Sequence, residues 1–135
     1  MISQQRNYLI SIIIILGLLL ADQFIKVKSI LSFNYFLNQN TFLGLFKNNS
    51  LGIVLLVILI LLVIYLALKQ QDKIIIYSVI FAGLGSNLVD RAIHHGVIDY
   101  WILFRSLWFN LADLAIVVGL AFLVNSIIQT KKSGG

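Results

Sequence analysis

The chain has 135 residues, of which 60% are hydrophobic and 11% are charged, and its mean hydropathy is +0.99. Soluble domains carry about 45–50% apolar and about 25% charged residues, so the composition excludes a small soluble core and indicates a protein whose solvent is lipid. The absence of cysteine excludes disulfides, thiolate metal sites and a cysteine nucleophile, and the net charge of +5 favours contact with anionic lipid headgroups over nucleic acid.

Four apolar stretches follow one another along the chain, at residues 8–24, 51–68, 74–89 and 110–128. A helix that spans a bilayer needs about 20 residues, and snorkelling of Lys73 can extend the short third stretch. The first stretch continues into polar residues without a small-x-small cleavage site, so we expect a retained helix rather than a signal peptide. With no linker or repeat, residues 1–135 are expected to form a single membrane-embedded domain of four transmembrane helices.

The connections between these stretches differ in character. Residues 69–73 form a polar turn, whereas residues 33–38 and 97–104 are rich in aromatic and β-branched side chains. Partial alternation in these two segments predicts short strands at the membrane surface. Tyr100, Trp101 and Trp108 occupy positions where interfacial aromatic residues are expected.

Polar residues gather on one side of the expected membrane. With four helices, the end of the first, the end of the third and the start of the fourth share one face, whereas Asp72 lies on the other face. Ionisable groups at a membrane boundary are costly and are functional by default. The residues expected at the shared face are Asp22, Lys26, Asn38, Asn87, Asp90, Arg91, Asp99, Asn110 and Asp113.

Several members of this cluster also have simpler structural interpretations. Asp22 and Lys26 are spaced i,i+4 and can pair on one helix. Asp90 can form an ion pair with its neighbour Arg91, and Asn110 can cap the fourth helix.

Two further pairs have comparable interpretations. The spacing of Gly83 and Asn87 is typical of close helix packing with an interhelical hydrogen bond. His94 and His95 are adjacent and are expected in a solvated turn rather than at a metal.

The positions of Asp99 and Asp113 indicate a chemical role for these two residues. Asp113 lies between Ala112 and Leu114 in an apolar run, and an unpaired carboxylate there would cost several kcal/mol. Two carboxylates held close share one proton, so one can activate a water while the other polarises a carbonyl. This pattern indicates aspartic-protease chemistry without a metal or cofactor, although pairs of aspartates are common.

Three sequence motifs together resemble those of lipoprotein signal peptidases, also called prolipoprotein signal peptidases or signal peptidase II. The motifs are Asp22-Gln23-x-x-Lys26, then Asn87-Leu88-Val89-Asp90-Arg91 with Gly96-Val97-Ile98-Asp99-Tyr100, and finally Phe109-Asn110-Leu111-Ala112-Asp113. The resemblance covers nearly the whole chain and implies an all-α membrane protein with four transmembrane helices and a small β-cradle on the extracytoplasmic face. It implies that Asp99 and Asp113 are the catalytic dyad and that the other seven cluster residues support it or contact substrate.

The resemblance also implies the reaction and its partners. The family is an intramembrane aspartic endopeptidase that removes the signal peptide of diacylglyceryl-modified prolipoproteins, cutting just before the lipidated cysteine. Implied partners are prolipoproteins with a lipobox, membrane lipids and globomycin-type inhibitors, and we expect a monomer. The implied location is the bacterial inner membrane, with both termini in the cytoplasm.

The sequence departs from the family pattern at several positions. The loop motif Asn-x-Gly-x-Ala-Phe has Asn40 in place of glycine and Phe42-Leu43 in place of Ala-Phe. Ser86 replaces a glycine, and Tyr100 stands where phenylalanine is usual. Because most departures are expected near bound substrate, the hypothesis is altered substrate preference or reduced inhibitor sensitivity.

Two other functions are compatible with the residues alone. A small ion- or proton-coupled transporter could use Asp113, but it would place acidic residues near mid-helix rather than on one rim. The second is a non-enzymatic membrane scaffold or an inactive homologue, against which the intact pair of aspartates favours an enzyme.

Overall fold

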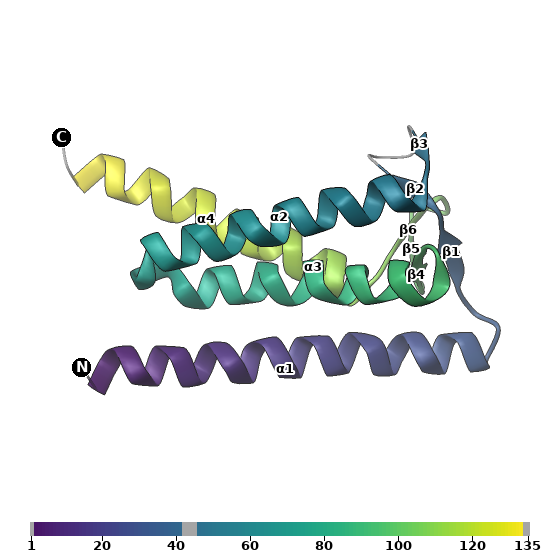
Figure 1. The fold of residues 1–135 in the computed structure, drawn as a ribbon, viewed down its shortest axis with the longest axis horizontal. Coiled ribbons are helices and arrows are strands. Elements are labelled where there is room, and N and C mark those ends of the chain that lie inside the picture. Colours follow the sequence, from purple (N-terminus) through teal and green to yellow (C-terminus); the bar gives the residue numbers. More distant parts are fainter. Residues whose placement is uncertain (1, 42–45, 134–135) are drawn as a thin grey trace.

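Four long helices form the body of the molecule in the computed structural model, which describes residues 2–41 and 46–133. They are α1 (Ile2–Leu31), α2 (Asn49–Lys69), α3 (Ile74–His94) and α4 (Leu111–Ser133), and a 3-10 turn, η1 (Gln71–Lys73), joins α2 to α3. All four are long and apolar enough to cross a membrane, which confirms the predicted helical membrane fold. Figure 1 shows that α1 begins and α4 ends at the same end of the bundle.

The helices extend beyond the apolar stretches that predicted them. α1 was expected over residues 8–24 and α3 over residues 74–89, but they run over Ile2–Leu31 and Ile74–His94. Hydropathy marks only the residues that suit lipid, whereas helical hydrogen bonding continues into polar flanks that contain no proline. As a result Lys26, Asp90 and Arg91 lie inside helices rather than beyond their ends.

α3 is the central helix. It packs against each of the other three helices and is the most buried of the four. Its small residues allow close approach, since a methyl group at Gly83 would lie 2.4 Å from the carbonyl oxygen of Ala112 on α4. This contact agrees with the close packing predicted at Gly83, and it brings the polar end of α3 against the start of α4.

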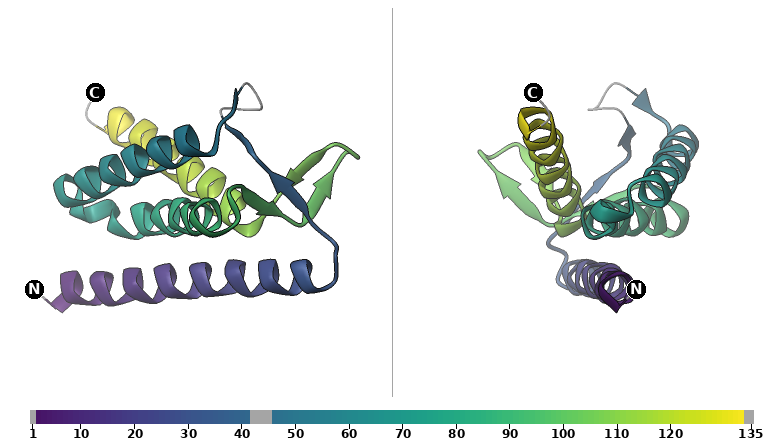
Figure 2. Two further views of the ribbon diagram at one scale, coloured as in Figure 1. Left: turned by 45° about the vertical axis from the view of Figure 1, so that its right-hand side comes forward. Right: turned by 90° about the vertical axis from the view of Figure 1, so that its left-hand side faces the viewer.

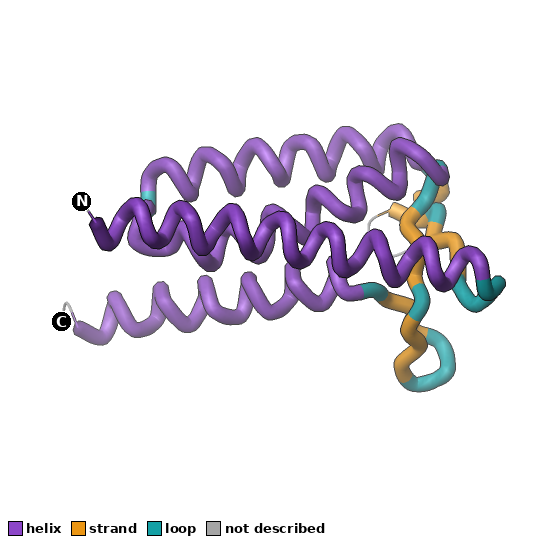
Figure 3. The backbone as a smooth tube through the Cα atoms, turned by 90° about the horizontal axis from the view of Figure 1, so that it is seen from below, coloured by secondary structure: helices purple, strands orange, loops and turns teal. Residues whose placement is uncertain are grey.

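Short antiparallel strands cover one end of the bundle, which we call the strand end. β1 (Phe36–Asn38) pairs with β4 (Val97–Asp99), β2 (Asn40–Thr41) with β3 (Phe46–Lys47), and β5 (Trp101–Leu103) with β6 (Leu107–Phe109). Figure 3 shows all of these strands at the same end. β1 and β4–β5 confirm the two predicted strand segments, whereas β2, β3 and β6 lie outside those segments and were not predicted.

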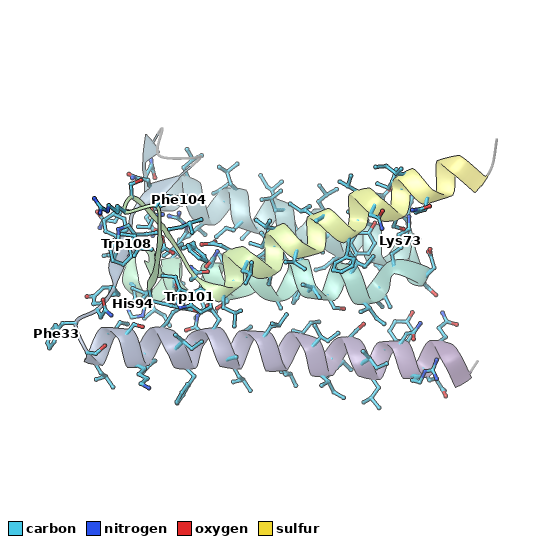
Figure 4. The ribbon with its side chains drawn as sticks, turned by 180° about the vertical axis from the view of Figure 1, so that it is seen from behind. Phe33, Lys73, His94, Trp101, Phe104 and Trp108 are labelled. Atoms are coloured by element: carbon cyan, nitrogen blue, oxygen red, sulfur yellow. The ribbon has the colours of Figure 1, made fainter. Side chains whose placement is uncertain are left out.

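Aromatic side chains surround the strand end. The β5–β6 hairpin projects away from the helices (Figure 2), and its tip residues Phe104 and Arg105 have positive φ angles of 50° and 66°. Figure 4 places Phe33, Trp101 and Trp108 at this end and Lys73 at the opposite end. The strand end therefore carries the interfacial aromatic residues that the sequence predicts.

Candidate active site

All nine predicted cluster residues lie at the strand end. α1 supplies two of them, β1 and β4 one each, α3 three, and the N-terminus of α4 two. In that order they are Asp22 and Lys26, Asn38 and Asp99, Asn87, Asp90 and Arg91, and Asn110 and Asp113. Residues from five elements thus converge on one site.

A buried ion cluster joins α1 to α3. The Nζ atom of Lys26 lies 2.5 Å from Asp22 Oδ2 and 2.7 Å from Asp90 Oδ2, and all three residues are at most 1% exposed. The predicted i,i+4 pairing of Asp22 with Lys26 is confirmed. The suggested ion pair between Asp90 and Arg91 is wrong, because Asp90 faces α1, where the Lys26 ammonium compensates its buried charge.

Asp90 also accepts a hydrogen bond from the backbone of β4. Asp90 Oδ2 accepts the Ile98 N–H at 2.9 Å, and the Gln23 side chain donates to Asp90 Oδ1 at 2.9 Å. Ile98 directly precedes Asp99, so the ion cluster fixes the strand that carries that aspartate. Gln23 had no role in the sequence prediction, although its place beside Asp22 was a signal for one.

Asp22 accepts hydrogen bonds from the hydroxyl groups of Ser86 and Tyr100, two residues that differ from the family pattern. Ser86 Oγ donates to Asp22 Oδ2 at 2.6 Å, and the Tyr100 hydroxyl donates to Asp22 Oδ1 at 2.7 Å. Both hydroxyls therefore face the ion cluster, and neither residue lines the cavity beside the aspartate pair. These two departures therefore lie beside the ion cluster, whereas Phe42 and Leu43 fall outside the described residues.

Asn110 and Asp113 form a reciprocal cap at the start of α4. The Asp113 N–H donates to Asn110 Oδ1 at 2.8 Å, and the Asn110 N–H donates to Asp113 Oδ2 at 3.2 Å. This is a capping box in which aspartate takes the place of the usual glutamate. The predicted capping role of Asn110 is confirmed, and the same geometry fixes the Asp113 carboxylate at the N-terminus of the helix.

Asparagine side chains donate to both aspartates. Asp99 accepts hydrogen bonds from Asn38 at 3.1 Å and from Asn110 at 2.8 Å. Asp113 accepts one from Asn87 at 2.8 Å, which confirms the predicted interhelical hydrogen bond of that residue. Asn110 thus contacts both carboxylates and sets their relative position.

A cavity of about 440 Å³ lies beside the two aspartates, within the range of small-molecule sites. Its apolar wall comes mainly from α2, including Leu55 and Leu59. Its polar wall consists of Asn38, Asn87, Arg91, Asp99 and Asp113. The cavity can therefore hold a polar group against the aspartates and an apolar group against α2.

Arg91 is held rigidly at the edge of this cavity. Its guanidinium donates to the carbonyl oxygen of Asn40 at 2.8 Å and packs against α2, where a methyl group at Gly52 would lie 2.7 Å from it. Arg91 is 7% exposed. The arrangement presents a fixed positive charge at one wall of the cavity.

The surroundings of Asp99 favour its neutral form. Burial, followed by the negative charge of Asp113, raises the pKa of Asp99 to about 6, and the hydrogen bonds from Asn38 and Asn110 oppose this shift. The two aspartates can therefore share one proton near neutral pH. Within residues 2–41 and 46–133, no group of three or more histidine or acidic side chains is placed to share a metal ion.

The chain is similar in sequence to proteins of known family. Residues 9–129 match the sequence model of the signal peptidase (SPase) II family. A lipoprotein signal peptidase of Thermodesulfovibrio yellowstonii is 34% identical over 109 residues, covering 76% of this chain and 74% of that protein. One of Mesorhizobium japonicum is 32% identical over 136 residues, covering 83% of this chain and 81% of that protein.

Two solved structures share the fold. A bacterial membrane enzyme determined by the in meso method at 2.3 Å resolution has a TM-score of 0.82 at 17% identity, over 93% of this chain and 91% of that one. A second, determined by the same method at 1.9 Å resolution, has a TM-score of 0.72 at 19% identity, over 87% of this chain and 91% of that one.

Proposed function

Because the chain belongs to the signal peptidase II family, we propose that this multi-pass membrane peptidase removes the signal peptide of diacylglyceryl-modified prolipoproteins. Cleavage falls just before the lipidated cysteine. The observation that carries the proposal is that Asp99 from β4 and Asp113 from α4 line the same cavity, which has an apolar wall. Such a cavity suits a peptide bond that adjoins a hydrophobic segment.

The two aspartates take different roles in the proposed reaction. Asp113 lies in the first turn of α4, where the helix macrodipole favours its anion, so it accepts a proton from the attacking water. In this proposal Asp99, whose pKa is raised to about 6 by burial and by the charge of Asp113, holds the shared proton, which it donates to the carbonyl oxygen as the water oxygen bonds to the carbonyl carbon. The resulting gem-diol collapses as Asp113 passes its proton to the leaving nitrogen and Asp99 recovers its own.

The remaining cavity residues hold the substrate in this proposal. Asn38 and Arg91 offer donors to peptide carbonyl groups on the polar wall, and the apolar wall of α2 receives the hydrophobic part of the substrate. Globomycin-type inhibitors would occupy the same cavity. The location is the bacterial inner membrane, with the strand end on the extracytoplasmic face and both termini in the cytoplasm.

Cleavage of a diacylglyceryl-cysteine lipobox peptide by the purified protein in detergent tests the function. We expect cleavage before the cysteine, and a loss of roughly 10²–10⁴-fold in kcat in Asp99→Asn and in Asp113→Asn. Asp72→Asn is the matched control, since Asp72 is exposed in η1 at the opposite end, and it should retain full activity.

The outcomes separate the parts of the proposal. A variant of either aspartate that cuts at the normal rate would remove that residue from the dyad. A folded wild-type protein that cuts neither this peptide nor other lipobox peptides would instead support an inactive homologue. Cleavage of the unlipidated peptide at the same rate would contradict the proposed requirement for the lipid.

A further inference from the structure

Three side chains accept hydrogen bonds from the first turn of α4. A helix leaves its first N–H groups without partners inside the helix, and here Leu111 donates to the Tyr100 hydroxyl at 2.9 Å and Ala112 donates to Asp22 Oδ1 at 3.3 Å. The third N–H, that of Asp113, donates to Asn110 Oδ1. The position of this turn therefore depends on contacts from outside α4 as well as on its own cap.

Tyr100 connects three parts of the site, two through its hydroxyl oxygen and one through its backbone. Its hydroxyl donates to Asp22 Oδ1 on α1 and accepts the Leu111 N–H of α4, while its own backbone directly follows Asp99. The residue is 8% exposed, and its ring packs edge-on against Trp101 with the ring centroids 5.0 Å apart. Burial and the hydrogen bond to Asp22 raise the pKa of Tyr100, so its hydroxyl remains a donor across the working pH range.

We propose that Tyr100 is a positioning residue for the aspartate pair, which fixes the first turn of α4, and with it Asp113, relative to Asp99. Asp99 and Asp113 come from separate elements joined by the projecting β5–β6 hairpin, most of which is exposed. Their alignment therefore relies on side-chain links at the base of the hairpin, namely Asn110 and Tyr100. The inference rests on the proposed peptidase function.

Misalignment of a catalytic pair affects rate more than binding. A displacement of about 1 Å can cost about 10²-fold in rate. Among the described residues, the Tyr100 hydroxyl bonds to Asp22 and to the Leu111 N–H, not to the cavity wall of Asn38, Arg91 and α2 that would bind substrate. Loss of the hydroxyl should consequently lower kcat and leave KM nearly unchanged.

The variant Tyr100→Phe tests the proposal, because it keeps the ring and removes only the hydroxyl. Tyr77→Phe is the matched control, since Tyr77 is a buried tyrosine of α3 in the helical core, apart from the aspartate pair. We expect kcat for the diacylglyceryl-cysteine lipobox peptide to fall about 10–100-fold in Tyr100→Phe with KM within about twofold of wild type. Tyr77→Phe should keep the wild-type kcat.

Hydrogen exchange at the Leu111 amide supplies a readout that does not depend on cleavage. Loss of its acceptor should speed exchange at this amide about tenfold or more in Tyr100→Phe but not in Tyr77→Phe. Faster exchange together with the selective fall in kcat would support the proposal.

Three results would overturn it. An unchanged kcat in Tyr100→Phe would show that the hydroxyl does not align the pair. Unchanged exchange at Leu111 would show that it does not hold α4. If both tyrosine variants show a lower kcat, a changed KM and a lower thermal stability to the same extent, the role of Tyr100 is general packing. If the wild-type protein cuts no lipobox peptide, the proposed function fails, while the exchange result still decides whether Tyr100 fixes the turn.

Discussion

At the scale of single residues, the aspartate pair is surrounded by neutral donors rather than paired cations. Asn38 and Asn110 donate to Asp99, and Asn87 donates to Asp113. Among the described side chains, both ion pairs are formed by Lys26, one with Asp22 and one with Asp90. A cation bound directly to the pair would lower both carboxyl pKa values and leave no proton to share. The asparagines therefore orient the two carboxylates without removing the shared proton.

The pH dependence of cleavage follows from the pKa of Asp99. This pKa is raised to about 6, so Asp99 is protonated below about pH 6 and loses its proton as the pH rises through that value. Since the proposed role of Asp99 requires the proton, kcat/KM should decline above about pH 6, and acidification should reduce it when both carboxyls become protonated. Initial rates of lipopeptide cleavage between pH 4 and 9 measure the profile, and a flat profile would contradict a shared proton.

We expect Asp90 to have a structural role, so its substitution should lower stability rather than change the chemistry. Asp90→Asn leaves Lys26 paired with Asp22 but weakens the contacts with Lys26 and the Ile98 N–H, so we expect a loss of about 1–3 kcal/mol. Lys26→Met leaves two buried carboxylates uncompensated and should cost more, about 3–5 kcal/mol. Thermal unfolding in detergent measures both, beside exposed Asp72→Asn, which should unfold like wild type. Equal stability of all three variants would contradict this account.

At the scale of elements, α3 transmits the geometry of the helix bundle to the site. It contacts every other helix, and Gly83 brings the backbone of α4 close. The contact of Gly83 with the backbone of Ala112 lies one residue before Asp113. The packing of α3 on α4 thus sets the position of the first turn of α4 along the bundle, while the α1–α3 ion cluster sets the position of β4.

Substitution of Gly83 should therefore impair both stability and rate. The methyl group of Gly83→Ala would lie 2.4 Å from the Ala112 carbonyl oxygen, so α4 has to move, at a cost of about 1–3 kcal/mol. The matched control is Gly17→Ala on α1, where the methyl group meets no atom within 4 Å and should be neutral or stabilise by up to about 1 kcal/mol. Thermal unfolding and kcat measure both effects. Similar behaviour of the two variants would contradict the close α3–α4 packing.

At the scale of the whole molecule, the two ends of the bundle differ in chemistry. The strand end carries the aromatic residues and the site, and the opposite end carries the polar turn η1 (Figure 4). Basic residues divide evenly between the two ends in the sequence, but Lys26 and Arg91 are buried within the site. Discounting them leaves the excess of basic residues at the end with the termini, which favours a cytoplasmic location for that end.

Cysteine labelling tests this orientation directly, because the chain contains no cysteine of its own. In intact spheroplasts, a membrane-impermeant thiol reagent should label Phe104→Cys at the hairpin tip, which is 87% exposed. It should label Asp72→Cys only after lysis, since η1 lies at the opposite end. The reverse pattern would place the site in the cytoplasm.

The sequence by itself determined the membrane fold and the membership of the polar cluster. Apolar runs of nearly bilayer length allow few structures other than helices, and an even topology places Asp22, Asp99 and Asp113 on one face, because alternate connections return to the same side. Spacing also revealed two local contacts, the i,i+4 pair and the cap of α4, because both depend on neighbours along one helix.

Only the tertiary structure decided which of these residues meet. The sequence placed Asp90 beside Arg91, but the rotation of α3 directs Asp90 to Lys26 and Arg91 to the loop at Asn40. It also turned the hydroxyls of Ser86 and Tyr100 away from the cavity and towards Asp22. Such contacts join residues more than 50 positions apart, and they depend on helix rotation and depth, which hydropathy and spacing do not encode.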